Sequence, residues 1–121
     1  GGIAGHAGLF ASIRGVSAYA QAILNDRICS SETLRMFSKK QSEKSSRGLG
    51  WDTRSAGSSA GTKFSSGSFG HTGFTGTSIW FDPARRLAVA LLTNRVHPTA
   101  DNSKIIAFRP RFHDAVIEEI S

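Results

Sequence analysis

Three short strand-like segments, separated by tight connections, constrain the fold of this chain more than any other feature. The segments are residues 68–73, 77–82 and 87–93, and they are joined by residues 74–76 and 82–86. The first connection contains glycine and the second contains proline, as is typical of turns between neighbouring strands. The pattern therefore predicts an antiparallel meander.

The order of side chains along these segments predicts a sheet with both faces covered. Ile79 and Phe81 fall on one face of their strand, whereas Ser78 and Trp80 fall on the other. Residues 87–92 are almost wholly apolar, which is typical of a strand that is buried on both sides. A further short strand is expected over residues 49–53, which gives a sheet of three to four strands.

Helices are predicted before and after the sheet. Ser12 suits the N-cap of a helix that continues to about Asn25, and Ser30 or Ser31 suits the N-cap of a second helix. Pro110 suits the first turn of a last helix over residues 110–120. The expected inward-facing residues are Val16, Tyr19, Ala20, Ile23, Leu24, Leu34, Phe37, Phe112, Val116 and Ile120, with His113 and Ile117 beside the last three.

Together these elements predict a single α+β fragment in which helices flank an antiparallel sheet. It has a helical part at residues 12–40, a serine- and glycine-rich loop at residues 54–67, a sheet at residues 68–94 and the C-terminal helix at residues 110–120. The loop has no hydrophobic period and is long for a compact domain, so we expect it to be mobile.

The composition excludes several classes of protein. A chain of 121 residues with 39% hydrophobic content suits one small domain, and no apolar run approaches the roughly 20 residues that span a bilayer. The net charge of +6 comes without a nucleic-acid-binding motif, so we interpret the basic run at residues 35–47 as a solvated face and expect no nucleic acid. A basic module that binds nucleic acid or another polyanion is the remaining alternative. Cys29, the single cysteine, excludes an internal disulfide, and four scattered histidines predict neither a metal site nor a cofactor.

Residues 71–73 carry the chemistry that the sequence makes visible. His71 and Thr72 supply a basic group and a hydroxyl group that can hold a substrate anion, and Gly73 lets a substrate approach an extended backbone. The backbone N–H of Phe74 comes next and can stabilise an oxyanion. This order predicts one wall of an acyl-transfer site, and the plain alternative is a strand that ends in a glycine-rich turn.

Five segments extend this pattern along the chain. They are residues 1–10, 48–51, 71–73, 78–83 and 91–95. In this order they resemble the C-terminal part of the serine β-lactamase-like family, which includes penicillin-recognising carboxypeptidases and related esterases. The resemblance covers nearly the whole chain, least closely residues 53–67. It implies the C-terminal portion of the β-lactamase/transpeptidase-like fold, in a bacterial protein that is periplasmic or exported.

Two motifs of that family are absent from these 121 residues. No serine is followed three residues later by lysine, and neither Tyr-x-Asn nor Ser-x-Asn occurs. The resemblance therefore implies a serine hydrolase whose nucleophile lies outside this chain, and we expect the chain alone to be inactive. The implied reaction is acyl transfer from an ester, amide or β-lactam, with residues 71–73 binding a small-molecule or peptide substrate and the Phe74 N–H binding the oxyanion.

The resemblance leaves further expectations about partners and about His6. The expected partners are the rest of the parent protein and a second copy bound through exposed apolar surface. The alternative function is a non-catalytic module that binds cell-wall peptide or a partner protein. His6 lies in a glycine-rich stretch that the family places near the catalytic cleft, so we expect a structural role, with support of the site as the alternative.

Residue 71 departs from the better-known members of the family, which have lysine there. Histidine is mostly uncharged at neutral pH, whereas lysine stays charged. We therefore expect anions to be held less firmly, and the activity to lean towards ester, amide or peptide substrates rather than β-lactams.

Overall fold

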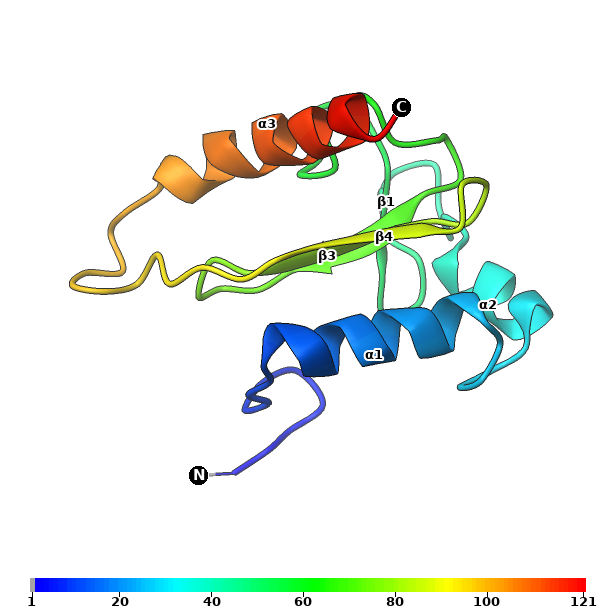
Figure 1. Cartoon of the computed structure of the whole chain (residues 1–121), viewed down its shortest axis with the longest axis horizontal. Helices are drawn as coiled ribbons and strands as arrows, with labels where there is room; N and C mark the ends of the chain where they lie inside the picture. The colour runs from blue at the N-terminus through cyan, green and yellow to red at the C-terminus, as the bar shows by residue number, and fades with distance from the viewer. Residues whose placement is uncertain (1) are drawn as a thin grey trace.

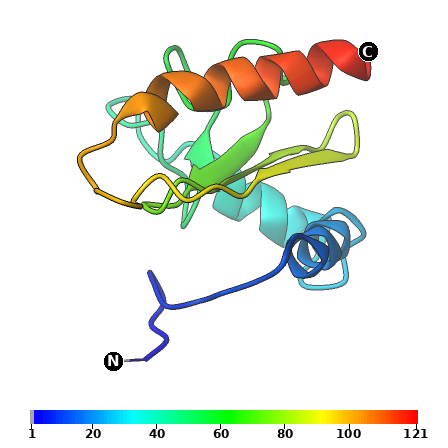
Figure 2. The same ribbon diagram turned by 60° about the vertical axis from the view of Figure 1, so that its left-hand side comes forward.

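The computed structural model describes residues 2–121. They form three layers, with one sheet between two layers of helix. The sheet is antiparallel, with strand order β1-β2-β3-β4, and its strands are Asp52–Thr53, Phe69–Thr72, Ser78–Asp82 and Leu87–Leu91. Helices α1 (Ile13–Leu24) and α2 (Ser31–Ser38) lie on one side, and α3 (Lys104–Glu119) lies on the other (Figure 1 and Figure 2). The predicted α+β class and the predicted meander are confirmed.

Serine caps start the first two helices, as the sequence predicts. The Ser12 hydroxyl accepts a hydrogen bond from the Gly15 N–H at 3.3 Å, and the Ser30 hydroxyl accepts one from the Thr33 N–H at 3.2 Å. Ser30, and not Ser31, is therefore the cap of α2. Each cap satisfies one of the backbone donors that a helix leaves unpaired at its start.

The prediction that Tyr19 and Phe37 face inward on these helices is wrong. Ala20, Ile23 and Leu34 are buried, but Tyr19 is 42% exposed and Phe37 is 43% exposed. Phe37 follows Leu34 by three residues, which rotates it about 60° away around the helix axis. In the short helix α2, that rotation places the Phe37 ring at the side of the helix and not against the sheet.

The last helix begins earlier than predicted. It starts at Lys104, so Pro110 lies inside the helix and not in its first turn. The buried residues are Ile105, Arg109, His113 and Ile117, each four positions after the last, while Ile120 is 57% exposed. The apolar pattern missed this stripe because a charged residue and a histidine occupy its centre.

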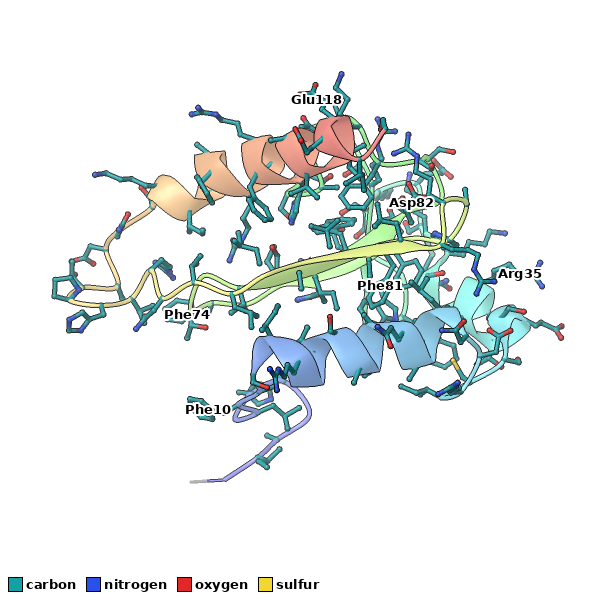
Figure 3. All side chains as sticks on the ribbon, in the orientation of Figure 1. Phe10, Arg35, Phe74, Phe81, Asp82 and Glu118 are labelled. Carbon is teal, nitrogen blue, oxygen red and sulfur yellow. The ribbon has the colours of Figure 1, made fainter. Side chains whose placement is uncertain are left out.

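Two hydrophobic clusters hold the layers together, one on each face of the sheet. Ala20, Ile23, Leu34, Phe69 and Phe81 form the cluster under α1 and α2, and Figure 3 shows Phe81 between the sheet and these helices. The cluster under α3 consists of Ala60, Phe64, Trp80, Val89 and Ile117. The predicted opposition of Phe81 and Trp80 across β3 is therefore confirmed.

The segment of residues 54–67 is irregular, as predicted, but it is anchored. Ala60 and Phe64 are buried in the α3-side cluster. The Asp114 carboxylate on α3 accepts hydrogen bonds from the N–H groups of Thr62 and Lys63, at 2.7 and 2.9 Å. The mobility of this segment stays a prediction.

The strand expected over residues 49–53 is shorter than predicted, because only Asp52–Thr53 pairs as β1. Gly50 has a φ of +80°, which is incompatible with extended strand geometry. The Leu49 N–H bonds to the Phe37 carbonyl at 2.7 Å instead of to a strand.

Candidate active site

The end of β2 forms a free strand edge. β1 pairs only with its first two residues, through Asp52 opposite Gly70 and Thr53 opposite Phe69. On its other side β2 pairs with β3 along its whole length, from Phe69 to Thr72. Within residues 2–121, the backbone of His71 and Thr72 therefore has no strand partner on the β1 side.

The ring of His71 lies next to an arginine. Its Nε2 is 2.9 Å from Arg47 Nη1, and its Nδ1 is 2.8 Å from the Thr72 carbonyl oxygen. A guanidinium can only donate, so Nε2 accepts and Nδ1 carries the proton that is donated to the carbonyl. His71 is thus a neutral imidazole in this arrangement, and the positive charge at this end of β2 belongs to Arg47.

Thr72 faces the opposite side of the sheet from His71, since neighbouring strand residues alternate. It lines a cavity of about 390 Å³. The other residues around this cavity are Ser46, Asp52, Ser55, Ala56, Gly57, Ser58, Ser59, Ile106 and Arg109. His71 and Thr72 therefore do not converge in one pocket, and a molecule that touches both has to lie along the strand edge.

The turn after β2 is closed by hydrogen bonds of Gly73. Its N–H donates to the Thr77 carbonyl at 2.8 Å, and its own carbonyl accepts from the Gly76 N–H at 3.1 Å. A Cβ at Gly73 would lie 2.1 Å from Thr77 Oγ1. The contact that requires glycine here is therefore internal to the turn, and clearance for a substrate stays a prediction.

Phe74 lies at the tip of this turn, at the end of the sheet away from Asp82 (Figure 3). Its side chain is 73% exposed, and its N–H donates to no acceptor within residues 2–121. Arg95 holds the residue from one side, because Arg95 Nε donates to the Phe74 carbonyl at 2.7 Å and the guanidinium stacks on the ring at 4.3 Å. The N–H therefore has no acceptor among the described residues, and its role as an oxyanion donor stays a prediction.

A second arginine, on α3, holds the same turn from inside the molecule. Arg109 is only 7% exposed, and its Nη2 lies 2.7 Å from the Gly73 carbonyl oxygen and 2.9 Å from that of Thr77. Burial lowers the pKa of Arg109, and the nearby charge of Arg95 lowers it further. Neither Arg47 nor Arg109 was singled out from sequence, because no motif or spacing connects them to residues 71–74.

The remaining histidines do not join this site. His113 is fully buried, with Nδ1 donating to the Ser59 carbonyl at 2.7 Å and Nε2 lying 3.2 Å from the Ser78 hydroxyl, so it is a packing residue, as its predicted place beside the apolar stripe of the last helix implies. His97 is exposed. His6 is exposed in the glycine-rich segment, and its ring makes no hydrogen bond within residues 2–121, so neither of its expected roles has a contact that supports it.

The structure of residues 2–121 also bears on membrane insertion and metal binding. None of the helices described there is both long and apolar enough to cross a membrane. No group of three or more His, Cys, Asp or Glu side chains in that part of the chain is arranged to hold a metal ion.

The antiparallel sheet between helical layers, with a His-Thr-Gly segment on its free edge, is the architecture of a serine hydrolase module. The chain belongs to the beta-lactamase family, whose family model, described as Beta-lactamase, matches residues 1–109. The resemblance drawn from the motifs is therefore confirmed.

Curated relatives and a solved structure agree with this assignment. The chain is 36% and 34% identical, over 114 residues, to two Escherichia coli proteins, from O157:H7 and K12, that are both named "Putative D-alanyl-D-alanine carboxypeptidase". The matches cover 86% of this chain but 26% of each relative, so the chain spans about a quarter of their length. A crystal structure of a beta-lactamase from Mycobacterium bovis shares the fold, with a TM-score of 0.76 and 23% identity over 90% of this chain and 44% of that one.

Proposed function

We propose that this chain supplies the substrate-binding edge of a serine hydrolase that acts by acyl transfer. The observation that carries the proposal is the free edge of β2 at His71 and Thr72, followed after Gly73 by the unbonded N–H of Phe74. An extended substrate can pair with such an edge, which leaves its carbonyl oxygen beside the Phe74 N–H.

The chemistry requires a serine from outside these 121 residues, since no Ser-x-x-Lys motif occurs among them. The serine oxygen attacks the substrate carbonyl carbon, and the negative charge that develops on the carbonyl oxygen is stabilised by the Phe74 N–H. The leaving group departs with a proton, and water then attacks the acyl-enzyme and releases the acid. The carboxypeptidase names of the relatives make a peptide that ends in D-alanyl-D-alanine the first substrate to test.

The full protein that carries this chain should be tested with three substrates: a p-nitrophenyl ester, a D-alanyl-D-alanine peptide and a chromogenic β-lactam. Replacing Thr72 by Val removes the hydroxyl at the strand edge, and we expect kcat/KM for the preferred substrate to fall about tenfold, the cost of one lost hydrogen bond to a charged group. Thr75→Val is the matched control, because Thr75 is an exposed residue of the adjacent turn. A protein that hydrolyses none of the three substrates contradicts the proposal.

The free edge also favours a second function, a non-catalytic module that binds peptide. Strand addition to an open edge needs backbone hydrogen bonds and no nucleophile. Calorimetry with the D-alanyl-D-alanine peptide separates the two functions. Binding that weakens in Thr72→Val without any product in the same tube supports the binding module, whereas product formation supports the hydrolase.

A further inference from the structure

We propose that Arg109 positions and polarises the peptide group whose N–H forms the oxyanion site. This inference rests on the proposed function and adds to it a positioning residue, which acts through the peptide group that it holds. The peptide group in question joins Gly73 to Phe74, and its carbonyl oxygen is the atom that accepts from Arg109 Nη2 at 2.7 Å.

The geometry of a single peptide group connects the arginine to the oxyanion site. The bond between Gly73 and Phe74 is trans, so its N–H and its C=O point in opposite directions. Arg109 on α3 holds the Gly73 carbonyl. The Phe74 N–H of the same peptide group therefore points away from α3. A cation on the carbonyl oxygen also draws electron density from the amide, which makes the N–H a stronger donor.

The environment of Arg109 argues against a purely structural role for its charge. The residue is 7% exposed, it forms no salt bridge within residues 2–121, and its Nε is buried without a hydrogen-bond partner. Burying an unpaired charge is costly. The groups that compensate it are the carbonyl dipoles of Gly73 and Thr77, which form the two ends of the turn that carries Phe74.

Arg109 restricts the conformations that the turn can adopt. The Thr77 carbonyl accepts from both Arg109 and the Gly73 N–H, so one guanidinium ties together the two strands that flank the turn. On the outer side, Arg95 holds the next carbonyl along the chain, that of Phe74. Both peptide groups of Phe74 are therefore held through their oxygens, and the Phe74 N–H stays open to a ligand.

The test compares Arg109→Met and Arg109→Lys with Arg111→Met in the full protein. Arg111 is an exposed arginine on the same helix and serves as the matched control. The readouts are kcat and KM for the best substrate, together with inhibition by phenylboronic acid, whose tetrahedral serine adduct places an oxygen in the oxyanion site.

We expect Arg109→Met to lower kcat by about tenfold to a hundredfold, somewhat less than the roughly 10²–10³ lost with an entire oxyanion donor. The boronate affinity should fall in parallel while KM changes by about twofold or less. Arg109→Lys should recover part of kcat, since a lysine keeps the charge but lacks the planar fork. A merely structural role would lower the amount of folded enzyme and leave the boronate affinity of the folded fraction unchanged.

A spectroscopic readout covers the case in which Arg109→Met does not fold. In the full protein with ¹⁵N-labelled phenylalanine, the Phe74 amide signal should shift in Arg109→Lys by more than the other phenylalanine amides. An unshifted Phe74 amide, or a folded Arg109→Met with wild-type kcat and wild-type boronate affinity, overturns the inference and leaves the proposed function standing. A wild-type protein with no hydrolytic activity overturns both.

Discussion

At the scale of single residues, Gly70 is a position where the sheet leaves no room for a side chain. A Cβ there would lie 2.3 Å from the Ile79 carbonyl oxygen and 2.5 Å from Trp80 Cδ2. We expect Gly70→Ala to lower the free energy of unfolding by about 1–3 kcal/mol, as overpacking of a core does. Gly67→Ala, where nothing lies within 4 Å of the added carbon, should change it by a few tenths. Denaturant unfolding of both variants measures the difference, and equal effects would contradict the prediction.

The charge beside His71 leads to a second residue-scale prediction. Since Arg47 carries the cation at the end of β2, Arg47→Gln should raise KM for a substrate with a free carboxylate about threefold to fivefold. The effect is modest because the pair is exposed to solvent. KM for a neutral ester should stay unchanged. Lys44→Gln, in the same exposed loop, is the control, and a rise in KM for both substrates would contradict this role.

The sequence made the strand edge visible at this scale but not the groups that support it. Residues 71–74 are consecutive, so their chemistry can be recognised as a pattern. Arg47 precedes His71 by 24 positions and Arg109 follows Gly73 by 36. In the sequence each has the ordinary appearance of a surface charge. Only the folded backbone shows that one of them is buried against two carbonyls.

At the scale of elements, the contact between α3 and the sheet depends on a neutral histidine. Burial lowers the pKa of His113 below its ordinary value, and the charge of Arg109 adds to this, against the hydrogen bond to Ser59 and the charge of Asp114. Near the ordinary pKa of histidine, His113 therefore binds a proton more readily in the unfolded chain than in the folded chain. The stability contributed by the neutral His113 is fully present above about pH 6.5, the ordinary histidine value, and it is lost progressively as the pH falls below that value.

Urea unfolding between about pH 7.5 and pH 5.5 measures this loss. We expect His113→Gln to flatten the pH dependence in that window, although it lowers stability at every pH. His97→Gln, at an exposed histidine, should leave the pH dependence as in the wild type. An unchanged slope in His113→Gln would show that other groups titrate on unfolding.

The elements themselves were predictable where their pattern was local. The meander follows from short connections, and the N-caps of α1 and α2 follow from serines placed before apolar stripes. The start of α3 does not, because Pro110 is typical of a first helical turn and yet lies six residues inside a helix that starts at Lys104. Packing of Ile105 and Arg109 against the rest of the molecule overrides that local preference.

At the scale of the whole molecule, the chain exposes more apolar surface than a lone domain needs. Ile3, Leu9 and Phe10 are 72%, 80% and 98% exposed, and Figure 3 shows Phe10 on the segment that leads into α1, outside the three layers. The chain also spans only 26% of its E. coli relatives. We propose that this surface packs on the rest of the protein.

The isolated 121-residue chain should therefore associate with itself and bind an apolar dye, whereas the full protein should do neither to the same extent. Light scattering and dye fluorescence check this. Phe10→Ser should reduce both signals. Phe81→Ser is unsuitable as a control because Phe81 is fully buried. Tyr19→Ser, at a less exposed position on α1, serves instead. A monomeric isolated chain without dye binding would contradict the proposal.

The position of Arg109 after all four strands in the chain also has a consequence for biosynthesis. A ribosome delivers all four strands before it delivers the helix whose arginine binds the carbonyls of Gly73 and Thr77. If Arg109 orients the Gly73–Phe74 peptide group, a nascent chain that lacks α3 can pair its strands while the Phe74 N–H is not yet oriented. If the proposed function holds, a nascent chain would gain its full reactivity only after α3 has been synthesised.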